Sequence, residues 1–357
     1  MENIDDTQHV AMKKLRVEGI VNESSDTKSY ILSSLDGEIS YRAGQFLTLV
    51  ALSPSGRTIR RSYSISSCPE LNEPLTITVK RISNGEFSRL LFDRTRVGDT
   101  LETIGASGFF ILPETIDPSG QVVFFAAGSG ITPVFSLLKS LLYINNSVRA
   151  LLIYSNRSSS DTIFFKQLEE LQKKFHARFT IRFLFSNAAD LSVSRLTPVS
   201  LEMLLDIYKI SRTEATFYVC GPGDYMRMVY YTLTSLGVPM AKIKREIFYI
   251  QQPAVVPAPA DTHPHQTTLI SGGNVFHFTV QYPVTILQAA KLLNIHLPFS
   301  CELGQCGACV AKCLHGQVWM TRNEVLLEEE IKAGYVLTCT GYPVYGDVTL
   351  TIDKNES

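Results

Sequence analysis

The 357-residue sequence has no excess of charge of either sign, since 33 Lys and Arg stand against 34 Asp and Glu and the net charge is -1. Nucleic-acid-binding proteins usually carry a broad basic surface, so we expect no nucleic-acid partner. No run of about 18 apolar residues is present, which argues against a membrane-spanning helix. The opening residues, MENIDDTQHVAMKKL, lack the basic and apolar regions of a secretory signal. We therefore expect a cytoplasmic protein with no membrane association.

Acid-base and nucleophilic catalysis also find little support in the sequence. The seven histidines are scattered, and neither a Ser-His-Asp arrangement nor a pair of neighbouring carboxylates stands out. The length is sufficient for two or three domains, each with its own core. The sequence gives no indication of the oligomeric state.

Cysteine is the residue type with the most informative pattern. There are seven cysteines, and three of them, Cys301, Cys306 and Cys309, have the spacing Cx4Cx2C, with Cys339 further along the chain. Without an export signal this pattern favours metal ligation over a disulfide framework. A zinc site usually takes two CxxC-type pairs, whereas a plant-type [2Fe-2S] site takes three thiolates from one loop and a fourth from afar. The spacing favours the [2Fe-2S] cluster, with zinc as the alternative.

Three residues close to these cysteines also bear on the cluster prediction. Gly304 and Gly307 have no Cβ, so their backbone can approach a cluster closely. Cys313 lies outside the ligand spacing, and we expect a small buried side chain there.

Changes in sequence pattern predict three domains and a linker. Residues 1–115 contain short strands separated by turn residues, which indicates an antiparallel barrel or sandwich. Residues 116–250 alternate buried-type strands with helices, which indicates a parallel sheet covered on both faces. Residues 251–266 are rich in proline and predict a semi-rigid linker, and residues 267–357 predict a small α+β domain.

Two apolar stripes have helical spacing: Phe164, Leu168, Leu171 and Phe175 in the second domain, and Ile286, Ala289, Ala290 and Leu293 in the last. Asp161 precedes the first stripe, and we expect it to cap that helix.

The cysteine region resembles a known family. LPFSCELGQCGACVAKC together with GYVLTCTGYP is similar to plant-type ferredoxins, and the likeness covers residues 268–353. It implies a β-grasp fold with Cys301, Cys306, Cys309 and Cys339 as the cluster ligands.

The first domain resembles the flavin domain of the ferredoxin-NADP reductase superfamily. RRSYSISS, residues 60–67, is similar to its RxYS motif, which includes Ser62. The resemblance implies that Arg61 pairs with a flavin phosphate, that Tyr63 lies against the isoalloxazine, and that Ser64 hydrogen-bonds near its reactive N5.

A second segment supports this resemblance. VKRISNGEFS is similar to another flavin-binding stretch of the superfamily, which implies cofactor contacts from Val79, Gly85 and Ser88. GDTLETIGASGFF matches the strand and loop that follow in its FAD-binding members. FAD is therefore favoured over FMN.

The second domain carries the corresponding nucleotide motifs. AAGSGITP departs from GxGxxG but matches the variant of this superfamily. Its glycines, Gly128 and Gly130, would let the backbone meet a dinucleotide pyrophosphate, and Thr132 opens the following helix.

VCGPGDYM and REIFY complete the resemblance. It places Cys220 beside the nicotinamide, with Gly221 and Pro222 at the same edge of the sheet, and brings Glu246 and Phe248 near the flavin. The implied candidate catalytic residues are Ser64, Cys220 and Glu246.

The loop YSNRSSSD, residues 154–161, bears on the choice of donor. An acidic residue near the adenosine ribose would hold a free 2'-hydroxyl, whereas Arg and Ser can hold a 2'-phosphate. Because Ser155 and Arg157 precede the first acid, NADPH is favoured over NADH.

The order of the three domains resembles the reductase components of bacterial multicomponent oxygenases, above all the reductase subunits of phenylacetyl-CoA epoxidases and next those of ketosteroid hydroxylases. The resemblance implies electron transfer from NAD(P)H through FAD to the [2Fe-2S] cluster and on to an oxygenase component. A Rieske oxygenase, a desaturase or a haem monooxygenase are alternative acceptors. A redox sensor without turnover and a flavin-free zinc protein are the alternatives of a different class.

Overall fold

The computed structural model describes residues 12–52, 58–83, 85–117, 120–145, 147–188, 194–248 and 258–352. These residues fall into two compact units, one within Lys13–Tyr249 and the other formed by the rest of the chain, mainly Ile250–Ser357. Each unit is described separately.

The first part of the larger unit is a six-stranded antiparallel sheet in the order β4-β3-β6-β1-β2-β5. Its elements are β1 (Lys13–Ser24), β2 (Thr27–Ser34), β3 (Phe46–Leu52), β4 (Thr58–Ser64), η1 (Pro69–Leu71), β5 (Thr76–Lys80), α1 (Glu86–Arg94) and β6 (Thr100–Ser107). Apolar and polar residues alternate along β1, where Leu15 and Val17 are fully buried, as expected for a strand with one face in the core. A bridge between Ile65 and Ile77 joins the two edges of the sheet, so the predicted barrel is confirmed.

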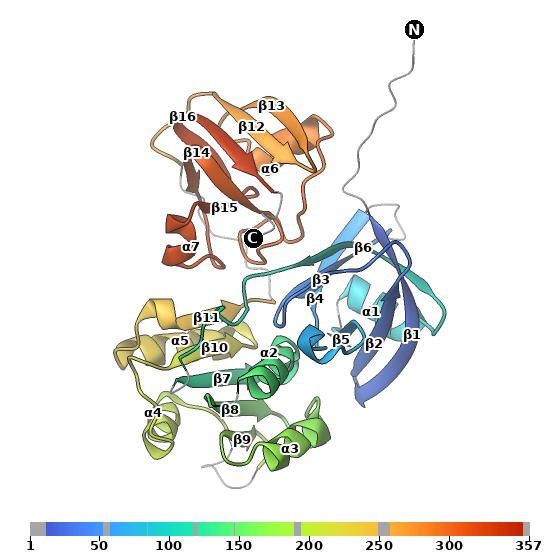
Figure 1. Cartoon of the computed structure of the whole chain (residues 1–357), viewed down its shortest axis with the longest axis vertical. Coiled ribbons are helices and arrows are strands. Elements are labelled where there is room, and N and C mark those ends of the chain that lie inside the picture. Colours follow the sequence, from blue (N-terminus) through green and yellow to red (C-terminus); the bar gives the residue numbers. More distant parts are fainter. Residues whose placement is uncertain are drawn as a thin grey trace. The chain divides into compact units, whose positions relative to one another are not determined.

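The second part of the larger unit is a five-stranded parallel sheet in the order β11-β10-β7-β8-β9. Its elements are β7 (Gln121–Ala127), η2 (Gly128–Gly130), α2 (Ile131–Ile144), β8 (Arg149–Asn156), α3 (Phe165–Lys174), β9 (Phe179–Phe185), α4 (Pro198–Ile207), β10 (Thr216–Cys220), α5 (Gly223–Ser235), η4 (Met240–Lys242) and β11 (Ile243–Glu246). Every residue of β7 is buried, because helices cover both faces of the sheet. Figure 1 shows this layered arrangement, which confirms the predicted α/β fold.

Hydrogen bonds and an ion pair among the described residues connect the barrel to the parallel sheet within this unit. The Tyr218 hydroxyl donates to the Ile111 carbonyl at 2.9 Å, and the Ser136 hydroxyl donates to the Ser67 carbonyl at 2.6 Å. Lys139, on α2, forms an ion pair with Glu73, in the barrel. The two predicted domains therefore share an interface in one compact unit.

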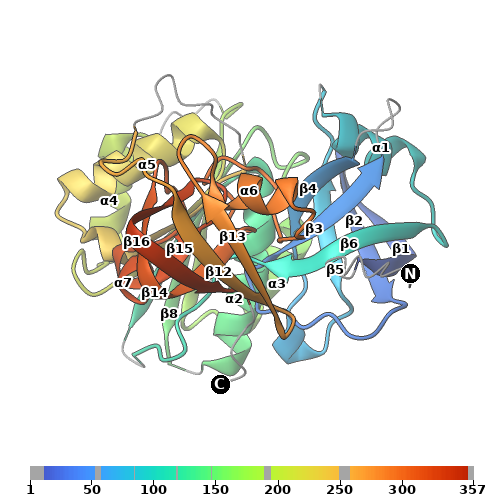
Figure 2. The ribbon, with the colours of Figure 1, turned by 90° about the horizontal axis from the view of Figure 1, so that it is seen from above.

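The smaller unit is a mixed five-stranded sheet in the order β13-β12-β16-β14-β15. Its elements are β12 (His265–Ser271), β13 (Asn274–Val280), α6 (Ile286–Leu292), β14 (Val310–Met320), α7 (Glu328–Lys332), β15 (Tyr335–Leu337) and β16 (Gly341–Thr351). The parallel pair β12 and β16 is central, and α6 packs on the sheet through β13 and β16, as Figures 1 and 2 show. Thr285 and Gln288 form a capping box that starts α6. β12 begins at His265, within the range predicted as linker, whose residues 251–257 lie outside the described part of the chain.

Two details of the helices differ from the sequence predictions. α3 begins at Phe165 with Phe164 as its N-cap, so the prediction that Asp161 caps this helix is wrong. The Asp161 carboxylate instead accepts a hydrogen bond from the Ser158 hydroxyl in the preceding turn. Leu293 is 56% exposed because it follows the last residue of α6, so it does not continue the buried stripe.

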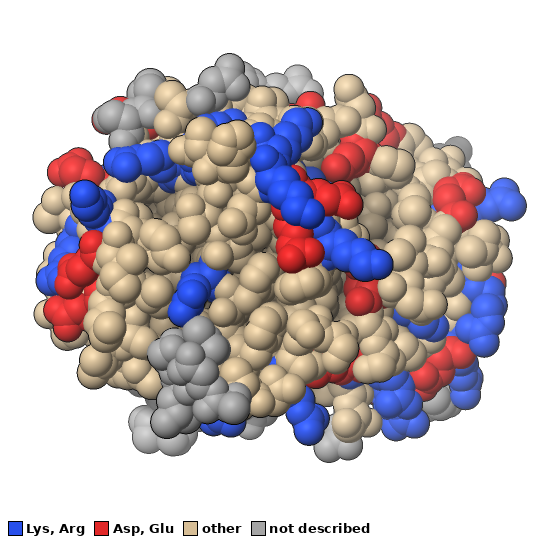
Figure 3. Space-filling view, turned by 90° about the horizontal axis from the view of Figure 1, so that it is seen from below, with Lys and Arg blue, Asp and Glu red and all other residues tan. Residues whose placement is uncertain are grey.

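Charged side chains are mixed in sign on the face drawn in Figure 3. Lys and Arg alternate there with Asp and Glu and leave uncharged areas between them. That face carries no broad basic area among its described residues, in keeping with the near-zero net charge.

Candidate functional site

Strand β4 presents the RSYS motif along one edge of the barrel. Ser64 is 3% exposed, and its hydroxyl has no hydrogen-bond partner among the described residues. A buried hydroxyl without a partner is unfavourable, so this position suits a ligand that offers one. Ser62 already shares a hydrogen bond of 2.9 Å with the Thr48 hydroxyl.

The two larger side chains of the motif differ in their surroundings. The ring of Tyr63 packs at 6.0 Å, centroid to centroid, against Phe87 of α1, and burial raises the pKa of the Tyr63 hydroxyl. Arg61 is exposed, and its guanidinium donates to the Arg60 carbonyl at 2.8 Å. This exposure leaves the guanidinium accessible to a phosphate group.

The loop between β5 and α1 is the second predicted flavin segment. The Ser88 hydroxyl accepts from the Ile82 N-H and donates to the Gly85 carbonyl, both at 3.2 Å. A Cβ at Gly85 would lie 2.4 Å from the Ser88 Oγ, so a larger residue there would displace the Ser88 hydroxyl. Val79 is fully buried on β5, where only its backbone could serve a cofactor.

Cys220 and Glu246 meet at the carboxyl edge of the parallel sheet. They are direct partners in the register of β10 and β11, and both are buried. Burial raises the pKa of Glu246 to about 8 and, together with the nearby Glu246, raises the pKa of the Cys220 thiol. Phe248, two residues beyond β11, is 45% exposed.

The glycine-rich turn packs against the same edge. A Cβ on Gly130 would lie 2.2 Å from the Cys220 carbonyl oxygen, so only glycine fits there. Gly128 has a φ of 53°, and its carbonyl accepts a hydrogen bond from the buried Tyr154 hydroxyl at 3.0 Å. Thr132 is buried, and its hydroxyl donates to the Ser129 carbonyl at 2.9 Å. Gly221 is buried and Pro222 exposed beside this turn.

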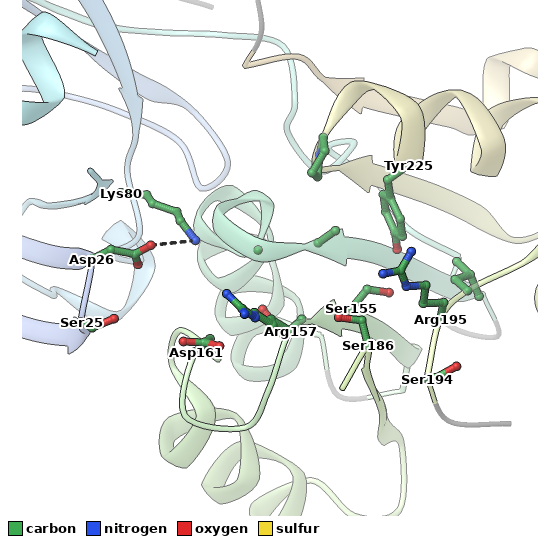
Figure 4. A pocket seen from close by; sticks show the side chains of 15 residues that line it. Ser25, Asp26, Lys80, Ser155, Arg157, Asp161, Ser186, Ser194, Arg195 and Tyr225 are labelled. Atoms are coloured by element: carbon green, nitrogen blue, oxygen red, sulfur yellow. Dashed lines mark ion pairs between the residues drawn. The ribbon is translucent and has the colours of Figure 1, made fainter. Parts of the chain in front are cut away.

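A cavity of about 490 Å³ opens at this edge, between the parallel sheet and the barrel (Figure 4). The residues that line it are Ser25, Asp26, Lys80, Ala127, Gly128, Ser155, Asn156, Arg157, Asp161, Ser186, Ser194, Arg195, Leu196, Pro222 and Tyr225. Of the predicted nucleotide-binding residues, it brings together Gly128, Ser155, Arg157 and Pro222. The candidate catalytic residues Ser64, Cys220 and Glu246 are not part of its described lining.

Sequence reasoning missed several residues of this cavity. Arg195 and Ser186 follow β9, and Tyr225 lies in the first turn of α5; in Figure 4 the Tyr225 and Arg195 side chains point toward Ser155. The barrel contributes Asp26 and Lys80, which no motif marked. The signal that could have found Arg195 and Ser186 is their place after a parallel strand, where ligands of such sheets bind.

In the smaller unit the four predicted ligand cysteines lie in two pairs. The thiols of Cys301 and Cys306 hydrogen-bond each other, and the Sγ atoms of Cys309 and Cys339 are 3.1 Å apart. Within the described ranges no three His, Cys, Asp or Glu side chains converge on a position for one metal ion. Two thiolates for each of two irons fit this arrangement better than one tetrahedral zinc does.

The loop around these cysteines also suits a cluster. Gly304 and Gly307 have φ angles of 70° and 72°, and a Cβ on Gly304 would lie 2.6 Å from the Arg322 carbonyl oxygen. The Leu303 N-H donates to the Cys301 Sγ at 3.4 Å. The Cys306 thiol and nearby backbone N-H groups lower the pKa of Cys301 to about 6. Such donors favour the thiolate form that a metal requires.

Family comparisons agree with this three-part architecture and show an oxidoreductase with FAD-binding, NAD-binding and iron-sulfur domains. Comparison with protein families matches residues 14–111 to an oxidoreductase FAD-binding domain, 124–230 to an oxidoreductase NAD-binding domain and 272–344 to a 2Fe-2S iron-sulfur cluster binding domain.

Two relatives are similar over most of the chain. The ferredoxin reductase component of 3-ketosteroid-9-alpha-monooxygenase from Rhodococcus rhodochrous is 32% identical over 92% of this chain and 94% of its own length. One component of the 1,2-phenylacetyl-CoA epoxidase from Escherichia coli is 31% identical over 88% of this chain and 89% of its own length. The chain belongs to the family of oxygenase reductase components, and it is an oxidoreductase of the ferredoxin reductase type.

Solved structures show the same fold. Phthalate dioxygenase reductase is 24% identical, with a TM-score of 0.59 over 97% of this chain and 99% of that chain. An intact type IV self-sufficient cytochrome P450 monooxygenase is 22% identical, with a TM-score of 0.69 over 95% of this chain and 41% of that chain. Among the described residues, no helix has the length and apolar character needed to cross a membrane.

Proposed function

We propose that this chain oxidises NADPH and passes the electrons through FAD and a [2Fe-2S] cluster to an oxygenase component. The observation that carries the proposal is the arrangement of Cys301, Cys306, Cys309 and Cys339 as two thiol pairs, in a chain that also has flavin and nucleotide domains. The proposed domains are residues 1–115 for the flavin, 116–250 for the nucleotide and 267–357 for the cluster, with a linker over 251–266.

FAD supplies the step between a donor of electron pairs and an acceptor of single electrons. In this proposal the Ser64 hydroxyl donates to the flavin ring, Tyr63 packs on it, and Arg61 pairs with its phosphate. Gly85 and Ser88 position the loop that faces the pyrophosphate of the cofactor.

Cys220 and Glu246 form the other wall of the proposed reaction site. The buried thiol is small and apolar, so it would exclude water without obstructing the nicotinamide. Burial raises the pKa of Glu246 to about 8, which favours the neutral carboxylic acid at pH 7. Both side chains would orient the nicotinamide, with Phe248 beyond them at the exposed rim.

The donor preference is proposed to be NADPH. Ser155 and Arg157 line the cavity, and Arg195 adds a second guanidinium. Asp161, the nearest acid of the same loop, also lines the cavity, where its carboxylate accepts from the Ser158 hydroxyl. Arginine is suited to bind a 2'-phosphate, and we propose that Arg157 and Arg195 do so together.

The relatives serve oxygenases of different chemistry, a ketosteroid monooxygenase, a phenylacetyl-CoA epoxidase and a glycine betaine monooxygenase. All three belong to oxygenase systems, which supports an oxygenase component as the electron acceptor of this chain. The phenylacetyl-CoA epoxidase type remains our specific prediction for that acceptor.

The function is tested with two artificial acceptors, ferricyanide for electrons from the flavin and cytochrome c for electrons from the cluster. Cys339→Ser should reduce ferricyanide with NADPH at the wild-type rate and lose at least about tenfold in cytochrome c reduction, because a cluster ligand is removed. Cys313→Ser is the matched control and should keep both activities. Equal cytochrome c rates for Cys339→Ser and wild type would refute electron exit through the cluster.

The donor preference is tested by the ratio of kcat/KM for NADPH to that for NADH. Arg195→Gln and Arg157→Gln should each reduce this ratio by about tenfold, since a charge-assisted hydrogen bond to the 2'-phosphate is lost. A ratio below one in the wild type would overturn the proposal for NADPH and leave the electron-transfer function standing.

A further inference from the structure

The interface between the barrel and the parallel sheet contains a buried ion pair. Lys139, on α2, is 7% exposed, and its ammonium pairs with the carboxylate of Glu73, which lies between η1 and β5 in the barrel. The Lys139 Nζ also lies 4.4 Å from the centroid of the Phe135 ring, one turn earlier on the same helix. Lysine is almost never fully buried unless it is paired, so Glu73 defines the position of the Lys139 ammonium.

The loop that Glu73 belongs to continues from the strand with the RSYS motif. Residues 65–75 connect β4, which ends at Ser64, to β5. Within this loop the Glu73 carboxylate accepts a hydrogen bond from the Cys68 N-H at 2.8 Å. Cys68 lies only four residues after Ser64 along the chain. A displacement of Glu73 is therefore transmitted through a short stretch of backbone to the serine of the proposed flavin site.

Helix α2 holds this loop with polar side chains of one face. The Ser136 hydroxyl is fully buried and donates to the Ser67 carbonyl at 2.6 Å, while Lys139 pairs with Glu73. Ser136 and Lys139 are three residues apart and so are neighbours on the helix surface. α2 begins directly after the glycine-rich turn at Gly128–Gly130. One helix thus joins the turn of the nucleotide domain to the loop that follows the flavin strand.

We propose that Lys139 is a positioning residue for hydride transfer, because it fixes the loop after the RSYS motif, and with it Ser64, relative to the glycine-rich turn. This inference rests on the proposed function. Lys139 is not part of the described lining of the nucleotide cavity, so it acts through the loop and not by contact with the nucleotide. A misplacement of reacting groups by about 1 Å can slow a reaction by about a hundredfold, so a small shift of this loop is sufficient to matter.

The test is stopped-flow reduction of the flavin in the full-length holoprotein over a range of NADPH concentrations. Lys139→Met keeps an unbranched side chain and removes the charge. Its limiting rate of reduction should fall by about tenfold, whereas the Kd of NADPH should stay at the wild-type value because the cavity lining is intact. Glu73→Gln can still accept from the Cys68 N-H and should show the same split between rate and Kd. In the double variant the losses should not add, because the two side chains act as one pair.

Hydrogen exchange in the absence of nucleotide provides a readout that does not depend on turnover. The amides of residues 65–75, followed by mass spectrometry, should exchange faster in Lys139→Met than in the wild type, because the loop has lost its ion pair with α2. Unchanged exchange in this loop would overturn the inference.

Lys174→Met is the matched control. The Lys174 Nζ also lies 4.4 Å from a ring centroid, that of Tyr143, but Lys174 contacts Tyr143 and Phe175 within the nucleotide domain. Its removal should change neither the limiting rate nor the exchange of the loop. Equal limiting rates for Lys139→Met and Lys174→Met would overturn the inference, and so would a weaker Kd at an unchanged rate. Absence of flavin reduction by NADPH and by NADH in the wild type would instead refute the proposed function.

Discussion

At the scale of single residues, Ser64 is the most informative side chain of the barrel. Its buried hydroxyl has no partner among the described residues, so we expect Ser64→Ala to leave thermal stability unchanged or slightly raised. The rate of flavin reduction by NADPH, followed by stopped-flow absorbance, should fall by about tenfold, the effect of one lost hydrogen bond.

The control for this variant is Ser66→Ala. Ser66 is equally buried, but its hydroxyl is hydrogen-bonded to the Thr78 hydroxyl at 2.8 Å. Its removal should lower stability and leave the reduction rate unchanged. The opposite pattern, a slow Ser66→Ala and a fast Ser64→Ala, would remove Ser64 from the proposed site.

Glu246 makes a residue-scale prediction about pH. Burial raises its pKa from 4.5 to about 8, so between these values the folded protein holds a proton that the unfolded chain releases. Folding stability therefore decreases as pH rises through this range. Glu246→Gln, which resembles the neutral form, should lack this decrease and melt several degrees above the wild type at pH 8.5.

Thermal melting of both proteins between pH 5 and 8.5 is the measurement. The difference in Tm should shrink toward the acid end, because the unfolded chain also begins to hold the proton as pH approaches the ordinary pKa of 4.5. A difference in Tm that stays constant across the range would show that Glu246 is ionised in the folded protein at neutral pH.

At the scale of elements, the two glycines of the turn between β7 and α2, Gly128 and Gly130, have different structural roles. A Cβ on Gly130 would press on the Cys220 carbonyl at 2.2 Å, while one on Gly128 would meet nothing within 4 Å. Gly130→Ala should therefore displace the end of β10 and strongly lower Tm. Gly128→Ala should lose only about 1 to 2 kcal/mol, from the left-handed backbone. Equal losses of Tm would contradict this packing.

Much of the element order was predictable because hydrophobic periodicity reports burial directly. One pattern is a continuous apolar run, as in the fully buried strand β7. The other is alternation, as at Phe276, Phe278 and Val280 of β13, where Phe278 and Val280 are in the core. The helix boundaries were less predictable. Asp161 has the chemistry of an N-cap, but the structure uses its carboxylate in the Ser158 turn, and Leu293 has the right spacing but follows the end of its helix.

The candidate site was predictable only where residues are close in sequence. The motifs indicated Ser155, Arg157 and Gly128, which do line one cavity. Lys80 comes from a barrel strand distant in sequence, and no local pattern marks it. Arg195 lies in a loop whose place after a parallel strand is its one signal in the sequence. Tertiary packing alone brings them to the nucleotide cavity.

At the scale of the whole molecule, the chain divides into a larger unit and a smaller unit. The Tyr218–Ile111 and Ser136–Ser67 hydrogen bonds connect the barrel with the parallel sheet, so flavin and nucleotide sites share one unit. The cysteine pairs belong to the other. The proposed function therefore requires electrons to pass from one unit to the other.

Anaerobic titration of the purified protein with NADPH tests this requirement most directly. FAD takes two electrons and a [2Fe-2S] cluster takes one, so the flavin and cluster absorbance bands should both bleach, with an end point at about 1.5 NADPH per protein. Bleaching of the flavin alone, with the cluster band absent or unchanged, would contradict electron transfer between the two units.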